Sequence, residues 1–221
     1  MRRFGNLLRL PIPDRDKINL DLPSFTLDVN QIALKAPSSR RPELASLAFL
    51  EYHYFDEASV ELCVTPETAL EISQGTPINS LGRTAYDRIR KTELFKARPP
   101  STTLQLTQEE SDELWDDIRD VLWPTVSNSA LTVAHRADVN QIFFHTVCSS
   151  AVANSAFVTL DGDMLRHRDE LRTRYGIWVA SPDDAWSYSQ SQYGLRQPNS
   201  SSVERIWMEQ DALLNRIRYG P

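Results

Sequence analysis

The chain has 221 residues, of which 41% are hydrophobic and 24% are charged, and its formal net charge is −6. This length suits one domain that folds on an apolar core without disulfides or zinc, and the composition excludes global disorder. The negative charge argues against a protein that holds nucleic acid mainly by bulk positive charge. No apolar run approaches the roughly 18–20 residues of a membrane span, and no signal-peptide core follows the basic N-terminus. We therefore expect a cytoplasmic protein without membrane contact.

The first part of the chain predicts two strands with a helix between them. Residues 1–22 mix proline, charged residues and scattered leucines, so an irregular arm is expected there. Residues 24–27 form a short apolar run that ends at Asp28 and predict a strand. Residues 43–55 carry apolar side chains at helical spacing, and residues 60–64 alternate as in a second strand.

A further helix is expected directly after the second strand. Thr65 suits the N-cap of this helix, and Pro66 suits its first position. The helix is predicted to run to about Ser73, because Gly75 is a natural stop.

Residues 82–128 are predicted to form a helical insertion with a charge character of its own. Residues 83–98 are mostly basic, whereas residues 109–120 are strongly acidic and keep apolar residues at helical spacing. The pair Pro99-Pro100 separates the two stretches. Two helices of opposite charge favour a hairpin that pairs with itself, and a basic face that binds a polyanion is the alternative.

The rest of the domain alternates helices with strands. Asp138 is expected to open a helix, and residues 156–160 to form a third strand that ends at Asp161. A polar helix is predicted for residues 164–175 and a last strand for residues 177–179. Strands that alternate with helices form parallel sheets with right-handed crossovers, so the chain is predicted to be an α/β protein.

The C-terminal part predicts two helices and a linker. Ser181 suits an N-cap, with Pro182 at the first helical position. Residues 189–202 are rich in serine, glutamine and asparagine and are predicted to be a linker. Residues 203–217 have the apolar spacing of a last helix.

Four acidic residues are expected to meet at one edge of the sheet. Asp28 and Asp161 each end a strand, so both lie at the carboxyl edge. Glu71 lies on the helix that leaves the second strand from that edge, and Asp138 begins a helix that descends to the start of the third strand. Asp163 is a candidate fifth member. Open α/β sheets place their ligands at this edge.

Carboxylates gathered in this way favour a bound metal ion. Two of them about 5 Å apart repel by roughly 3 kcal/mol at an effective dielectric near 20. Proteins relieve this repulsion by protonation or by binding a hard divalent cation. Because only oxygen ligands are offered, Mg²⁺ or Mn²⁺ is favoured over zinc, and a phosphodiester is the expected substrate. The alternative for each acid is a simple role as a helix cap.

These residues together resemble the PIN domains, metal-dependent ribonucleases of the VapC-toxin and nonsense-decay type. The matching segments are an Asp-x-Asn strand end, a helix with a glutamate, a helix begun by an aspartate, a Thr-x-Asp strand end and a last strand before proline, at residues 25–30, 68–72, 137–139, 157–163 and 176–182. The resemblance implies a PIN-like three-layer domain over residues 23–182, with a small parallel sheet flanked by helices. Residues 1–22 are then an arm and residues 183–221 a C-terminal helical extension.

The resemblance also implies roles for particular residues. The acids implied as catalytic are Asp28, Glu71, Asp138 and Asp161. One or two Mg²⁺ or Mn²⁺ ions would be held by Asp28, Asp138, Asp161 and Asp163. Substrate would be oriented or bound by Asn30, Thr159, Arg166 and Arg168. Aromatic residues such as Trp178 or Tyr188 are further candidates, because exposed rings can stack on bases.

The function implied is endonucleolytic cleavage of single-stranded RNA, toxin-like and with a protein partner, an antitoxin or a second copy of the chain. A first alternative is an inactive PIN-fold interaction module that uses the insertion and the last helix to hold a partner. A second is a phosphatase with an aspartyl nucleophile. The order of Asp161-Gly162-Asp163 and the lack of any lysine after Lys96 speak against it.

Overall fold

The structure is a computed structural model that describes residues 8–9, 21–28, 45–66, 68, 96–97, 103–149, 152, 154–206 and 208. Its elements in chain order are β1 (Leu8–Arg9), β2 (Ser24–Leu27), α2 (Ala45–Phe55), β3 (Glu61–Val64), β4 (Lys96–Ala97), α5 (Gln108–Leu122), α6 (Val133–Ser149), β5 (Ser155–Val158), α7 (Gly162–Arg166), α8 (Arg168–Tyr175), β6 (Val179–Ala180) and α9 (Pro182–Tyr193). Residues 200–206 are also helical. None of the helices in this part of the chain is both long and apolar enough to cross a membrane.

The strands form one mixed sheet in the order β4-β1-β3-β2-β5-β6. Strands β3, β2, β5 and β6 are parallel, which confirms the predicted α/β class with a parallel sheet. Strands β1 and β4 add an antiparallel edge, and β1 belongs to the predicted arm. Strands β3 and β5 lie on opposite sides of β2, so the strand order reverses its direction between β2 and β5. This position is the topological switch point of the sheet.

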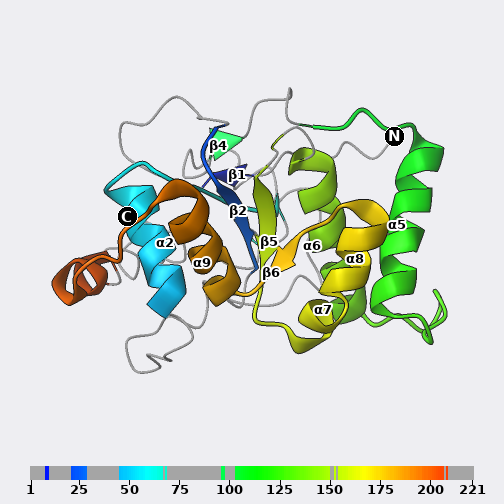
Figure 1. Cartoon of the computed structure of the whole chain (residues 1–221). Coiled ribbons are helices and arrows are strands. Elements are labelled where there is room, and N and C mark those ends of the chain that lie inside the picture. Colours follow the sequence, from blue (N-terminus) through cyan, green and yellow to red (C-terminus); the bar gives the residue numbers. More distant parts are fainter. Residues whose placement is uncertain are drawn as a thin grey trace, which may run out of the picture.

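Helices cover both faces of the sheet (Figure 1). Side chains alternate along each strand, so successive residues of β2 point to opposite faces. We call the side covered by α2 and α9 the apolar face; its core includes Phe25, Leu27 and Leu62. We call the side covered by α5, α6 and α8 the mixed face; its apolar residues include Ile142 and Phe157.

Helix α9 belongs to this core, although it begins where the predicted domain ends. Ala185 and Trp186 are buried in the apolar-face cluster, and α9 contacts α2, β5 and β6. Its N-terminus is the predicted one, because Ser181 and Asp184 form a capping box and Pro182 is the first helical residue. The cap signal was therefore sufficient to predict where this helix begins.

The prediction that Asp138 opens a helix is wrong. Helix α6 begins at Val133, and the backbone N–H of His135 donates to Thr132 Oγ1 at 3.2 Å. Asp138 consequently lies in the second turn. The first turn is exposed, with Val133 at 52% exposure, so it lacks the apolar period from which the helix start was predicted.

Other predicted boundaries also differ from the structure. The polar helix predicted over residues 164–175 is two helices, α7 and α8, which meet at His167. The third strand ends at Val158, two residues earlier than predicted. The predicted linker over residues 189–202 is wrong at both ends. Helix α9 continues to Tyr193, and the last helix starts at residue 200 instead of 203.

Within the predicted insertion, the acidic stretch forms a helix, as predicted. Helix α5 has a capping box between Thr107 and Glu110 and packs against α6 and α8. Lys96 and Ala97, near the end of the basic stretch, form strand β4 and are not helical. Residues 83–95 and 98 lie outside the described residues, as do the rest of the helix predicted after Thr68 and the chain beyond Met208.

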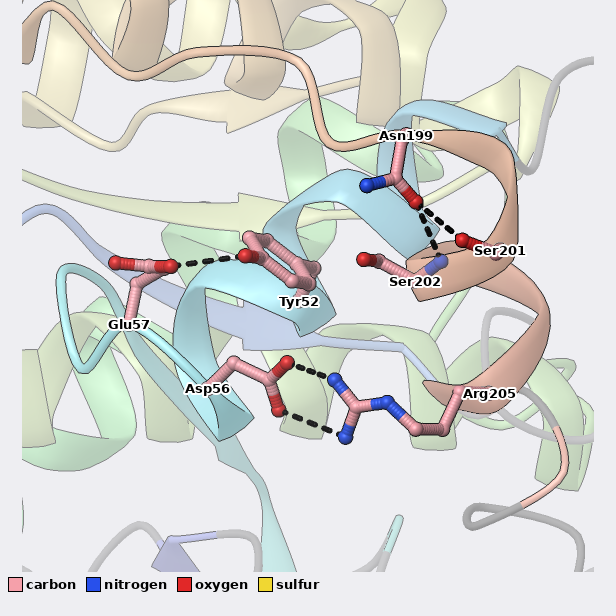
Figure 2. A network of polar contacts seen from close by, with 7 residues as sticks. All are labelled: Tyr52, Asp56, Glu57, Asn199, Ser201, Ser202 and Arg205. Atoms are coloured by element: carbon pink, nitrogen blue, oxygen red, sulfur yellow. Dashed lines mark hydrogen bonds and ion pairs between the residues drawn. The ribbon is translucent and has the colours of Figure 1, made fainter.

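The segment after α9 lies along α2 (Figure 2). Asn199 Oδ1 accepts hydrogen bonds from Ser201 Oγ and from the backbone N–H of Ser202, and so caps the last helix. Arg205 reaches back to Asp56 just after α2 and makes an ion pair with both carboxylate oxygens. Ile206 of the same helix is fully buried. The C-terminal segment is therefore part of the folded unit up to this point.

Candidate active site at the carboxyl edge of the sheet

Asp28 follows β2 directly at the topological switch point. Its side chain is only 2% exposed, and its backbone N–H donates to the carbonyl oxygen of Val158 at 3.0 Å. A buried carboxylate is costly unless hydrogen bonds or opposite charge compensate it. Its presence at the edge where α/β sheets bind ligands makes Asp28 the centre of the candidate site.

Thr159 joins the ends of β2 and β5. Its hydroxyl donates to Asp28 Oδ2 at 2.7 Å and accepts from the backbone N–H of Asp161 at 2.9 Å. Thr159 is fully buried, so this charge-assisted bond is shielded from water. The structure thus brings together Asp28 and Thr159, two residues predicted at the site from the sequence.

Asp161 lies beside them but also has a structural role. Its Oδ1 accepts from the backbone N–H groups of Asp163 and Met164, both at 2.9 Å, and so caps helix α7. The alternative that this acid is a helix cap is therefore correct for one of its two oxygens. Any ligand would have to share the carboxylate with the helix start.

The charged residues after Asp161 are engaged in surface ion pairs. Arg166 pairs with Asp163 at 2.7 Å, and Arg168 pairs with Asp184 at 2.8 Å. All four side chains are between 43% and 70% exposed. Exposed pairs of this kind contribute about 0–1 kcal/mol, so an anionic ligand could replace either carboxylate at little cost.

Asp138 lies on the sheet-facing side of α6. It precedes His145 by seven residues, nearly two helical turns, so both residues are on the same side of the helix. His145 Nδ1 lies 2.8 Å from Thr26 Oγ1 on β2. Asp28 is two residues beyond Thr26 and so points to that same face of the sheet. Asp138 and Asp28 are therefore both on the side where α6 and β2 face each other.

A complete metal centre is not formed by the described residues alone. Among them, no group of three or more His, Cys, Asp or Glu side chains is placed to hold a metal ion. Two of the predicted site residues, Asn30 and Glu71, lie outside the described part of the chain. The donors present are carboxylate and hydroxyl oxygens, which fit Mg²⁺ or Mn²⁺ better than a soft metal.

A buried polar layer lies next to the site and was not predicted from the sequence. Gln141 and His145 of α6 are both buried, and Gln141 Oε1 accepts from Thr68 Oγ1 at 3.3 Å. Thr65 caps the helix start that holds Thr68, as predicted, with its Oγ1 3.1 Å from the Thr68 N–H. The available signal was a set of polar residues four apart, Gln141, His145 and Ser149, among the apolar residues Ile142, Phe143, Phe144, Val147 and Cys148 of the same helix.

The aromatic candidates lie away from the acids. Trp178 directly precedes β6, and Tyr188 donates to Asn154, which directly precedes β5, so both lie toward the amino edge. Their rings meet edge to face at 4.6 Å, and the Arg172 guanidinium lies over Trp178. These rings pack against the core cluster and one another, so they do not line the carboxyl edge.

Comparisons of the chain with protein-family models, with curated proteins and with solved structures gave no match. The resemblance to PIN domains therefore rests on the sequence motifs of the chain alone.

Proposed function

We propose that the carboxyl edge between β2 and β5 is the active site of a PIN-type, metal-dependent endoribonuclease. The observation that supports it most is the buried Asp28 carboxylate, which the Thr159 hydroxyl holds at 2.7 Å at the switch point of the sheet. A hydrogen bond of this kind fixes the direction in which the other carboxylate oxygen points. A fixed, partly desolvated carboxylate suits the binding of a hard cation.

The roles of the residues follow from their positions. Asp28, Asp138, Asp161 and Asp163 would hold Mg²⁺ or Mn²⁺. Outside the described residues, Glu71 would be a further catalytic acid and Asn30 would orient the substrate. When bound, such a metal activates water and stabilises charge on a phosphodiester. Thr159 keeps Asp28 oriented. Arg166 and Arg168 can exchange their exposed carboxylate partners for the phosphates of RNA.

Single-stranded RNA is the substrate that we propose. The net charge of −6 limits the number of phosphates that the protein can neutralise at once. Few phosphate contacts give a shallow dependence of affinity on salt. A short, flexible strand that reaches one acidic edge fits this charge better than a long duplex does.

The test is a cleavage assay on labelled single-stranded RNAs with Mn²⁺, with Mg²⁺ and with EDTA. Asp28→Asn should lower the rate at least about 100-fold, as for loss of a group that stabilises developing charge. Asp169→Asn is the matched control, because Asp169 is an exposed aspartate on α8, and it should cut as fast as the wild type. A folded wild type that cuts no RNA with either metal would exclude the nuclease.

One observation favours a second candidate, an inactive interaction module of the same fold. Asp161 Oδ1 is committed to capping α7, and the described acids do not form a group of three. In this case the protein neither cuts RNA nor binds Mn²⁺. Isothermal titration calorimetry with Mn²⁺ separates the two candidates. The nuclease requires a site that binds the ion, and Asp28→Asn should weaken that binding.

A further inference from the structure

We propose that His145 is a positioning residue that fixes the register of α6 along β2, and with it the position of Asp138 relative to Asp28. This inference rests on the proposed function, because it assigns the buried polar layer a role in assembling that site. His145 does not itself touch the reacting groups in this proposal. It acts through its hydrogen bond to Thr26.

Helix α6 has two different sides. Val139, Phe143 and Val147 share one side and belong to the apolar cluster shared with α5 and α8. Asp138, His145 and Ser149 share another side, at spacings of seven and four residues. That second side meets polar groups of β2 and of the turn after β3.

Two hydrogen bonds tie this polar side to the sheet. His145 Nδ1 and Thr26 Oγ1 are 2.8 Å apart, and the Thr68 hydroxyl donates to Gln141 Oε1 at 3.3 Å. Apolar contacts are non-directional, so they allow a helix to shift along a sheet at modest cost. A buried polar pair has a short range and a required angle, so it can specify one register.

The register matters for the acids. Asp138 is seven residues from His145, about 10.5 Å along the helix, and Asp28 is two residues from Thr26, about 6.6 Å along the strand. The His145–Thr26 bond thus places both carboxylates beyond the same fixed point. By these lengths the two carboxylates lie about 4 Å apart along the strand direction, and a slip of one helical turn would shift Asp138 by about 5.4 Å relative to Asp28.

The bond can be removed without leaving either of its two partners unpaired. The double variant Thr26→Val with His145→Leu replaces both partners by apolar side chains of similar volume, which is close to neutral for stability. His145→Asn is the rescue variant, because its amide can place a polar atom where Nδ1 lies. Ser149→Ala is the control, since its contact with His145 is long, at 3.5 Å.

The experiment measures Mn²⁺ binding by titration calorimetry and RNA cleavage as separate kcat and KM values. The double variant should unfold at the same urea concentration as the wild type, bind Mn²⁺ at least tenfold more weakly and lose kcat with little change in KM. His145→Asn should recover most of the binding, and Ser149→Ala should match the wild type. Thr26→Val alone replaces the double variant if the latter does not fold.

A readout without metal tests the register itself. Spin labels at Val133→Cys on α6 and Ser187→Cys on α9 occupy exposed positions, and the native cysteines are buried. The distance distribution between the labels should broaden or shift in the double variant and stay narrow in Ser149→Ala. An unchanged distribution overturns the inference. The double variant can show a shifted distance distribution while the wild type neither binds Mn²⁺ nor cuts RNA. That combination supports the register role of His145 and refutes the proposed function.

Discussion

The two faces of the sheet are built from neighbouring residues of the same strands but differ in chemistry. The apolar face takes Phe25 and Leu27 from β2 and Leu62 from β3, and it is covered by the apolar sides of α2 and α9. On β2 and β3 the alternate positions face the mixed side and are polar or thiol-bearing and buried; they are Ser24, Thr26, Asp28, Glu61 and Cys63. As predicted, no disulfide joins Cys63 to Cys148, its neighbour in the core.

Because of this difference, apolar side chains mainly stabilise the fold, whereas the buried polar side chains mainly fix the positions of the site residues. Burying a large apolar side chain contributes about 1.5–3 kcal/mol, whereas a neutral hydrogen bond contributes about 0.5–1.5 kcal/mol net. Buried apolar side chains, which form a large cluster on each side of the sheet, are therefore the main source of folding free energy. The buried polar groups of the mixed face contribute less folding free energy, but their hydrogen bonds form in only one geometry. Asp28, the last of these groups along β2, lies in the candidate site. Substitutions of apolar core residues should consequently lower mainly the stability, whereas substitutions of the buried polar residues should lower mainly the activity.

The largest effect is expected from Phe25→Ala on the apolar face. Phe25 is fully buried, so its removal leaves a cavity and should lower the free energy of unfolding by about 3–5 kcal/mol. Urea denaturation followed by circular dichroism measures this loss. Phe25→Leu is the control and should lose much less. A cost below about 1 kcal/mol for Phe25→Ala would show that the core is not tightly packed around Phe25.

Thr159→Val should have a smaller effect on stability and a larger one on activity. It removes the donor to Asp28 and the acceptor of the Asp161 N–H, which should cost about 1–3 kcal/mol. We also expect cleavage to fall at least tenfold, because Asp28 is no longer held in one orientation. Thr159→Ser should restore both. Stability lost without any loss of cleavage would contradict a positional role of the mixed face.

Much of the fold could be predicted from local pattern. Strand β2, helix α2 and the cap at Ser181 follow from alternation, helical spacing and capping chemistry. The antiparallel edge could not be predicted in this way. Strands β1 and β4 have only two residues each, too few to show a period, and their pairing joins residues far apart in the chain.

The candidate site was predictable only in part. Asp28 and Thr159 follow strands, so the topology itself brings them together. An aspartate before a helix has the same sequence pattern whether it caps the helix or binds a metal, which is why the capping role of Asp161 required the structure. His145 was not predicted, because its partner Thr26 lies 119 residues away in the sequence.

The outer side of α2 offers a weaker test, on the helix that covers the apolar face. The pair between Arg205 and Asp56 is partly exposed (Figure 2), so Arg205→Ala should cost less than about 1 kcal/mol. Ile206→Ala in the same turn is the comparison and should cost about 2–5 kcal/mol, since Ile206 is fully buried. Urea midpoints of both variants measure the ratio. Equal losses would show that the C-terminal segment is held by charge and not by packing.

The smallest effect concerns the cap of α5, the outer helix on the mixed-face side. The backbone N–H and the hydroxyl of Thr107 donate to Glu110 and hold the pKa of its carboxyl below the usual glutamate range. A lowered pKa in the folded state means that the ionised carboxylate stabilises the fold at neutral pH. This stabilisation is lost as the pH falls through the folded-state pKa. Glu110→Gln keeps a capping box but cannot titrate.

The urea midpoints of wild type and Glu110→Gln should therefore differ slightly at pH 6 and converge under acid conditions. The other carboxylates titrate equally in both proteins and cancel in the difference. A constant difference across the range would contradict the titration of this cap. A convergence would show that α5 is stabilised at its start by one exposed carboxylate, whereas its buried residues Ile118 and Leu122 hold it to the mixed face at every pH.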